Sequence, residues 1–368
     1  MTSVSLGYAK FEPLSQNTTA SRIQTMQIFH RKFYRKTGES KSFLLAMFAI
    51  CMASAFSCST NFNVNAPYKE ENAVYGLLEI HDNAQIIKIG KVFQNGPGVT
   101  AAQAAQQMDS LYQSDSLLVT LTDNNTGAST RLNKFYNTLK EPGYFASPGQ
   151  YLYTTPAGFA LNPADNYGIT IYDTKTKTQS SAATNIVNDI SPIRPYQGSQ
   201  VSISNVTGLY EVNFGAGANA ATYDVNMYIP IHEYKKSDST LIKTDTLVFN
   251  ILSTYPVTGA ATNIAKYFQN IQFYQFVGAS LKVDPTVFRK MDSLDFEITG
   301  AATDLANYVA VNQPQAGIVQ NKPNYTNITN GVGIFSSRLI THIKAPLTLA
   351  SFDLLNTSQY TVGLNFVK

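Results

Sequence analysis

The sequence predicts a mainly β fold: a β-sandwich domain over residues 72–190, then an α+β domain over residues 200–368 with a few short helices on a sheet. First, short runs of β-branched and aromatic residues recur with turn signals between them, a spacing typical of sandwiches. Second, only 14% of the residues are charged, whereas Tyr and Phe number 22 and 21. That composition suits sheets whose surfaces carry hydroxyl and amide groups. Third, helical patterns are confined to a few short segments.

The predicted sandwich begins with a hairpin in which two apolar runs flank a short turn at residues 81–83. Thr100, with Gln103 three residues later, forms a capping box for a short helix that ends near Leu111. A second hairpin turns at residues 123–127. The strands predicted in this domain cover residues 73–80, 84–93, 117–122, 129–136, 151–154, 167–172 and 180–187.

A Pro-containing stretch at residues 191–195 is predicted to stiffen the chain between the two domains. In the second domain, apolar and aromatic residues at mixed helical spacing predict a helix over residues 264–281. Thr303 is predicted to cap another helix, which ends at Val311. The strands predicted in this domain cover residues 201–206, 209–214, 223–231, 246–252 and 294–298.

The front of the chain has the pattern of an export signal. An apolar run at residues 42–58 follows a basic segment at residues 30–36 and ends in small residues. The run is too short for a comfortable membrane crossing, which needs about 20 apolar residues. Residues 1–25 fit no signal region, so we predict that translation starts at Met26; a genuine leader is the alternative. Residues 58–71 are predicted to form a polar tether.

Cys58 closes the apolar run after a small residue, and this end resembles the lipobox of bacterial lipoproteins. The resemblance implies removal of residues 1–57, a thioether-linked diacylglycerol on Cys58 and acylation of the new amino terminus. Cysteine usage supports this interpretation, because Cys51 lies in the removed segment and Cys58 is left without a disulfide partner. Ordinary signal cleavage after Ala55 is the alternative.

Near its end the chain carries an N-I-x-N-G-x-G-x-F element, whose positions are filled by Asn327, Ile328, Asn330, Gly331, Gly333 and Phe335. With the lipobox and the opening strand at residues 74–77, the element resembles a family of Bacteroidota-type outer-membrane lipoproteins of unassigned function. Members are often encoded beside TonB-dependent outer-membrane transporters, which implies an accessory or substrate-capturing role. No catalytic residues come with the family. The tyrosine-rich strands of the first domain also resemble Ig-like or transthyretin-like modules of exported bacterial proteins.

The same element can be interpreted from its residues alone. Asn330, Gly331 and Gly333 are residues at which a positive φ costs little conformational free energy, so the chain can turn tightly there. Ile334 and Phe335 can then enter a core. We interpret the element as an interdomain turn with a buried aromatic residue, and a ligand-binding loop is the alternative.

The histidines beyond the predicted signal, His81, His232 and His342, are far apart in sequence and lack metal-ligand spacing. The sequence contains no G-x-S-x-G elbow, P-loop or C-x-x-C motif. Residues 123–127 resemble the start of a calcium loop, but the glutamate that closes such a loop is missing, so a hairpin turn is predicted. We predict no catalytic residues, metal site or cofactor, and the ligand-binding residues are unknown.

Asp292, Asp295 and Glu297 form the densest group of carboxylates, and strand geometry puts Asp295 and Glu297 on one face. A pair of carboxylates can do acid/base work on a sugar, but a solvated strand face is the simpler interpretation. The chain has no Trp on which a sugar could stack. Exposed tyrosines such as Tyr151 and Tyr153 are the candidates to replace it.

The formal net charge of +3 comes largely from the predicted signal, and no basic patch indicates a nucleic-acid partner. These observations together predict a non-enzymatic lipoprotein, lipid-anchored in the outer membrane, that helps a TonB-dependent transporter to capture or admit a nutrient. A structural or adhesive cell-surface protein is the alternative. A hydrolase that uses Asp295 and Glu297 is a third hypothesis.

Overall fold

The computed structural model describes residues 71–92, 100–112, 115–140, 143–147, 149–257, 262–313 and 324–368. The chain divides into Met1–Pro67 and a compact unit, Tyr68–Lys368, to which all the described residues belong. The predicted signal, Cys58 and nearly all of the predicted tether lie outside the described residues.

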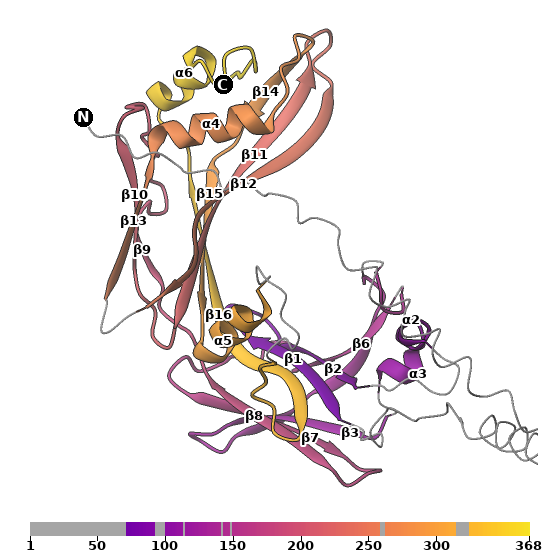
Figure 1. The fold of residues 1–368 in the computed structure, drawn as a ribbon. Helices are drawn as coiled ribbons and strands as arrows, with labels where there is room; N and C mark the ends of the chain where they lie inside the picture. Colours follow the sequence, from indigo (N-terminus) through magenta and orange to yellow (C-terminus); the bar gives the residue numbers. More distant parts are fainter. Residues whose placement is uncertain are drawn as a thin grey trace, which may run out of the picture. The chain divides into compact units, whose positions relative to one another are not determined.

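The described residues form a mainly β fold with three sheets and few short helices, which confirms the predicted fold class (Figure 1). The large sheet has the strand order β12-β11-β15-β16-β1-β2-β6-β5, and β14 also pairs with β11. Its strands are β1 (Asn72–Leu78), β2 (Ile86–Lys91), β5 (Asn133–Asn137), β6 (Gln150–Thr154), β11 (Thr222–Lys235), β12 (Leu241–Pro256), β14 (Val287–Met291), β15 (Leu294–Ala301) and β16 (Gly331–Ala345).

Two smaller sheets and the helices complete the described part of the chain. The four-stranded sheet consists of β4 (Ser129–Arg131), β3 (Leu117–Asp123), β7 (Asn166–Asp173) and β8 (Gln179–Asn185). The three-stranded sheet consists of β13 (Asn263–Gln269), β10 (Leu209–Gly215) and β9 (Ser191–Arg194). The helices are α2 (Ala101–Ala105), α3 (Met108–Leu111), α4 (Asn270–Ser280), α5 (Thr303–Asn312) and α6 (Leu349–Thr357).

Strand β16 belongs to both predicted parts of the chain. Its first residues, Gly331 to Ser337, pair in parallel with β1, and its residues Arg338 to Ala345 pair antiparallel with β15 (Figure 1). One continuous sheet therefore contains strands from both sides of residues 190–200. The division into two domains at that point stays a prediction.

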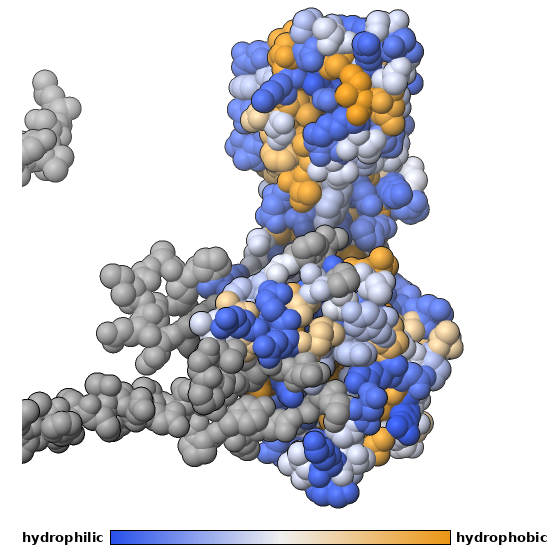
Figure 2. Space-filling model, turned by 90° about the vertical axis from the view of Figure 1, so that its right-hand side faces the viewer, coloured by the Kyte–Doolittle hydropathy of each residue, from blue (hydrophilic) through white to orange (hydrophobic). Residues whose placement is uncertain are grey.

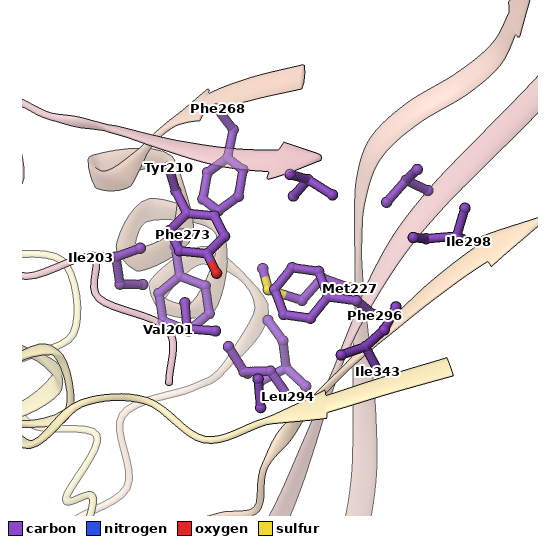
Figure 3. Packing of buried hydrophobic residues seen from close by; sticks show 14 of the residues in the cluster. Val201, Ile203, Tyr210, Met227, Phe268, Phe273, Leu294, Phe296, Ile298 and Ile343 are labelled. Carbon is purple, nitrogen blue, oxygen red and sulfur yellow. The ribbon is translucent and has the colours of Figure 1, made fainter. Parts of the chain in front are cut away.

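Two clusters of buried apolar residues hold the sheets together. The first joins β1 and β2 to β3 and β7 and includes Val74, Val119 and Phe335. The second lies between the large sheet and the three-stranded sheet, where the ring of Tyr210 lies 5.6 Å from that of Phe268 and 6.3 Å from that of Phe296 (Figure 3). Full burial of an aromatic side chain such as Phe stabilises the fold by about 1.5–3 kcal/mol. These rings therefore contribute to holding the two layers together.

Alternation along β15 gives this strand one buried face and one polar face. Leu294, Phe296 and Ile298 are at most 1% exposed and belong to the second cluster. Asp295 and Glu297 fall between them and point to the other side of the sheet. The predicted half-buried strand is therefore confirmed.

In the space-filling view, hydrophilic residues predominate on the visible face and apolar residues form separate patches between them (Figure 2).

Several predicted elements are wrong in detail. Residues 264–281 form strand β13 and then helix α4, because Ile264 and Phe268 alternate as buried residues of a strand that pairs with β10. The chain turns into the helix at Gln269, where Gln269 and Gln272 form a capping box. Residues 191–194 are a strand paired with β10 and not a linker.

Other corrections concern boundaries. Residues 201–206 form only a single β-bridge, between Val201 and Leu347, because the backbone N–H of Ile203 donates to Ser351 Oγ at 2.8 Å and not to a strand. Residues 129–136 are divided at Leu132 between β4 and β5, which belong to different sheets. Thr303 is the first residue of α5, whose cap is Ala302. The predicted capping box of Thr100 and Gln103 is confirmed.

The N-I-x-N-G-x-G-x-F element forms the entry into β16. Asn330 has φ 54° and Gly333 has φ 107°, so both adopt the left-handed backbone that the sequence indicated. Ile334 and Phe335 are 4% and 0% exposed, which confirms their predicted place in a core. A Cβ on Gly333 would lie 2.0 Å from the carbonyl oxygen of Val74, so the close approach of β1 also requires glycine there.

Candidate functional site

Three adjacent strands of the large sheet bring polar side chains together on the face opposite the second cluster. In the sheet register, Tyr228 of β11 lies opposite Asp295 of β15, and Glu297 lies opposite His342 of β16. Asp295 is also opposite Lys344. Side chains alternate along a strand, so all of these groups share one face. They come from three segments of the sequence and meet only because β11, β15 and β16 are neighbours.

These side chains line a groove with a volume of about 510 Å³. Its charged and titratable lining consists of Tyr228, Asp292, Asp295, Glu297, His342 and Lys344. With a neutral histidine, three carboxylates and one ammonium group leave the lining with two net negative charges. The groove therefore has a negative electrostatic potential that favours positively charged groups.

His342 lies between the two carboxylates of β15. Its Nδ1 is 3.2 Å from Asp295 Oδ1, and its Nε2 is 3.8 Å from Glu297 Oε2. The imidazole is half exposed, whereas the side chains of Asp295 and Glu297 are only 20% and 19% exposed. Because the carboxylates are shielded from water, their interaction with a nearby cation is screened less than at an open surface.

The phenol of Tyr228 donates a hydrogen bond to Glu297 Oε1 at 3.2 Å. Burial, the charge of Glu297 and this hydrogen bond all raise the pKa of Tyr228 above its ordinary value. The phenol is therefore a neutral donor at physiological pH, and it holds one oxygen of Glu297 in place.

A second histidine–carboxylate pair lies beside the groove. His232 Nε2 is 2.9 Å from Asp292 Oδ2, and His232 Nδ1 is 3.1 Å from the Thr244 hydroxyl. Each ring nitrogen of His232 therefore has a hydrogen-bond partner. Within the described ranges, no group of three or more His, Cys, Asp or Glu side chains has the geometry of a metal site.

The structure brings together the three carboxylates that the sequence singled out, because Asp292, Asp295 and Glu297 all line the groove. It also adds two of the three histidines considered, His232 and His342, which pair with these carboxylates. Sequence reasoning missed this association. The strand predicted at residues 223–231 includes Tyr228, but no strand was predicted at residues 331–345, where the sequence suggested a turn, so nothing indicated the position of His342.

The other sequence candidates lie elsewhere. His81 is exposed in the turn between β1 and β2. Residues 123–127 form the predicted hairpin turn, in which Asp123 Oδ1 accepts from the backbone N–H of Asn125 at 2.9 Å. Tyr153 is 3% exposed and is not the exposed sugar-stacking residue that the sequence suggested. Cys58 lies outside the described residues.

Comparison with known proteins adds little to this geometry. No protein-family model and no curated protein matches the chain. Among solved structures, one match is described as "Structural insight into host cell surface retention of a 1.5-MDa bacterial ice-binding adhesin". It has 10% sequence identity and a TM-score of 0.17, and it covers 77% of this chain and 66% of that chain. A likeness at this level does not indicate a shared fold.

Among the residues that the structure describes, none of the helices has the length and apolar character of a membrane span.

Proposed function

We propose that this chain is a non-enzymatic envelope lipoprotein, anchored to the outer membrane through Cys58, that captures a ligand for a TonB-dependent transporter. The observation that carries the proposal is the apolar run at residues 42–58, which follows a basic segment and ends at Cys58. The other cysteine, Cys51, lies inside the run. Two or more acyl chains hold a protein stably at a bilayer, whereas one does so only marginally.

The groove on the large sheet supports the capture role. It is open to solvent along a sheet face, and its carboxylates are already held by His342 and Tyr228 in a fixed arrangement. A preformed, charged surface of this kind binds a ligand without a large ordering cost.

The anchor is tested by mass spectrometry of the mature amino terminus, with wild type and Cys58→Ser expressed in a Gram-negative host. We expect a peptide that begins at acylated Cys58 in the wild type and an unacylated protein released from the membrane fraction for Cys58→Ser. An unmodified peptide that begins at Phe56 would remove the anchor and the transporter role with it.

The transporter role is tested by affinity purification from membranes solubilised in a mild detergent. Co-purification of a large β-barrel with the wild type is the expected result. A protein that migrates alone counts against this role. Adhesion to cells or extracellular matrix without a barrel partner would instead favour the alternative, a structural or adhesive surface protein.

A further inference from the structure

We propose that the outer edge of β12 pairs with β12 of a second copy of this chain. The two strands run antiparallel, with the two-fold axis at Val248, so that the large sheets of two copies become continuous. The inference goes beyond the proposed function, because it concerns a protein partner and neither the anchor nor a ligand. It stands on three features of β12: an edge without the usual protection, the direction of its backbone groups and a sequence that suits pairing with itself.

The first feature is the edge itself. β12 is an end strand of the large sheet and has 16 residues. Its residues 246–254 include no charged residue and no proline, and its register with β11 is regular from Lys243 to Asn250. Edge strands of natural proteins are usually short, covered, or interrupted by a charged residue, a proline or a bulge. A long edge without these features is one that a further strand can extend.

The other end strands of the described sheets have such protection. β5 has five residues, one of which is Lys134. β9 has four and contains Pro192, and β4 has three. β13 carries Lys266 near its centre, and β8 forms a bridge from Ser181 to Thr329. Among the strands that the structure describes, β12 therefore has the edge best suited to receive a partner.

The second feature is the direction of the backbone groups of β12. Pro230 of β11 lies opposite Thr246, and its carbonyl accepts from the N–H of Asp292 at 3.2 Å, on the side of β14 and β15. The backbone groups of one strand residue point to one side, so Pro230 and Thr246 are a pair without mutual ladder hydrogen bonds. The N–H of Thr246 donates instead to Oδ1 of its own neighbour Asp245, at 2.9 Å. The backbone groups of Thr246 therefore point away from β11.

The same direction holds for the alternate residues that follow. Val248 lies opposite Tyr228, and Asn250 lies opposite Asn226, in the same register as Thr246. Hydrogen-bonded and non-hydrogen-bonded pairs alternate along an antiparallel ladder, so these are also pairs without mutual hydrogen bonds. Three alternate residues of β12 thus direct a backbone donor and a backbone acceptor toward the outer edge.

The third feature is that these three residues are symmetric about Val248. In an antiparallel pair centred there, Thr246 of each copy lies opposite Asn250 of the other, and Val248 lies opposite itself. Every outward-pointing residue then meets another, so each pair can exchange both of its hydrogen bonds. On the other face of the sheet Leu247 lies opposite Phe249. Both are only partly buried against the second cluster, and apolar cross-strand pairs stabilise a sheet.

The charges of β12 favour the same arrangement. The charged residues of the strand are Lys243 and Asp245, and they form an ion pair with each other. In the antiparallel pair they fall beside residues 251–253 of the other copy, which are uncharged. A parallel pair in register would instead place each charge against its own counterpart, which is destabilising. A second, antiparallel copy therefore fits this edge without a clash of like charges.

The expected complex is a weak, closed dimer. One pair of short strand segments buries a small area, and interfaces below about 1,200 Å² are typical of transient complexes. A two-fold contact uses the same edge of both copies, so the assembly stops at two chains.

The experiment is sedimentation velocity on the purified full chain in non-ionic detergent. We expect a concentration-dependent shift from monomer to dimer between about 1 and about 100 µM. Val248→Lys, which sets two like charges on the axis, should weaken the dimer by at least about tenfold. Val248→Pro should have an effect of the same size, about tenfold or more, because it removes a donor of the outer edge and none of the β11–β12 ladder.

Ile242→Lys is the matched control. Ile242 and Val248 are exposed apolar residues of the same strand, at 55% and 47% exposure, but Ile242 lies outside the segment that pairs. The control should associate as wild type does. Circular dichroism confirms that each variant is folded, so a loss of the dimer is not a loss of the fold.

Disulfide cross-linking tests the position of the axis. In a chain with Cys51→Ser and Cys58→Ser, Val248→Cys should form a disulfide-linked dimer under mild oxidation. Opposite residues of a hydrogen-bonded antiparallel pair have Cα atoms about 5.5 Å apart, which a disulfide can bridge. Ile242→Cys should not cross-link, because the two copies of that residue lie about 40 Å apart along the paired strands.

The inference is wrong if wild type stays monomeric over this range, if Val248→Lys associates as wild type does, or if positions 248 and 242 cross-link equally. A monomeric wild type that loses another co-purified protein on Val248→Lys would assign the edge to a different partner and would also overturn the inference. The proposed function fails separately. The cross-linked chain lacks Cys58, so an unacylated Cys58 would remove the lipoprotein role and leave the dimer standing.

Discussion

The side-chain amide of Asn327 pairs with both backbone groups of Phe335. Asn327 Nδ2 donates to the carbonyl of Phe335 at 2.7 Å, and the N–H of Phe335 donates to Asn327 Oδ1 at 3.0 Å. The second N–H of the amide is 3.1 Å from Asp304 Oδ2 on α5. One amide thus takes the place of a neighbouring strand beside Phe335 and ties β16 to a helix. This contact accounts for the Asn at the start of the sequence element, whereas the Phe at its end is accounted for by burial of its ring in the first cluster.

Asn327→Ala should lower the free energy of unfolding by about 2–6 kcal/mol, because two buried backbone groups lose their partner and each costs about 1–3 kcal/mol. Asn327→Asp should be no better, since its carboxylate faces the carbonyl of Phe335 and the carboxylate of Asp304. Urea denaturation measures both. The exposed Asn83 provides the matched control, and Asn83→Ala should stay within about 0.5 kcal/mol of wild type; equal effects at both sites would contradict the assignment.

The same arrangement occurs at the end of the chain, where Asn356 Nδ2 donates to the carbonyl of Phe366 at 2.9 Å and Asn356 Oδ1 accepts from the N–H of Phe366 at 3.1 Å. Asn356→Ala should therefore destabilise the protein by a similar amount, about 2–6 kcal/mol. Because Asn327 and Asn356 tie different segments, the double variant should show additive losses in urea denaturation. A loss well below the sum would show that the two segments unfold together before the rest.

Gly333→Ala should prevent the normal pairing of β1 with β16. The new Cβ meets the Val74 carbonyl oxygen at 2.0 Å and sits on a backbone with φ 107°. Gly127, with φ 77° and open space around its Cβ position, is the matched control. Gly127→Ala should cost only the conformational strain, about 1–2 kcal/mol, and Gly333→Ala should cost clearly more. Thermal unfolding by circular dichroism distinguishes the two, and equal losses would contradict a close approach of β1.

Arg289→Met should destabilise the fold by about 3–5 kcal/mol, as expected when one partner of a buried ion pair is removed. Arg289 is 2% exposed; its Nε lies 2.8 Å from Glu233 Oε1, and its Nη1 donates to the carbonyl of Leu364 at 2.8 Å. Glu233→Gln combined with Arg289→Met should recover part of the loss, because no unpaired carboxylate remains. Chemical denaturation of the single and double variants gives the coupling, and a coupling near zero would refute the pairing.

Stability should fall at alkaline pH, in part because of Tyr274. Burial raises the pKa of this phenol above its ordinary value, against a smaller opposing effect of the Ser351 side chain. The phenol donates a hydrogen bond to the Ser351 carbonyl at 2.9 Å. A tyrosine in the unfolded chain ionises near its ordinary pKa of about 10. The contribution of Tyr274 is therefore complete below that pH and is lost as the pH rises toward the folded-state pKa.

Tyr274→Phe tests this linkage. The variant should lose about 1 kcal/mol at neutral pH with its hydrogen bond, and its stability should fall less steeply than that of wild type between about pH 9 and about pH 11. Urea denaturation across that range is the measurement. Tyr196→Phe, at a side chain that is 60% exposed, is the control and should follow the wild-type curve. An identical slope for Tyr274→Phe would show that another group is responsible.

The sequence alone determined the class of fold and the facing of individual strands, because alternation is a local property of the chain. The spacing of Leu294, Phe296 and Ile298 was enough to place Asp295 and Glu297 on a wet face. Residues 264–281 were misassigned because an apolar run has similar periodicity in a strand and in a helix until its pairing partner is known. Only β10 decided that its first part is extended.

Tertiary structure alone decided the groove and the way β16 passes from β1 to β15. His342 and Glu297 lie 45 positions apart in the sequence and become neighbours through the register of an antiparallel pair. No local pattern encodes that register, because it follows from which buried faces pack together across the whole molecule. The export signal remains a prediction, and it could be proposed from sequence because a basic segment followed by an apolar run is a local pattern.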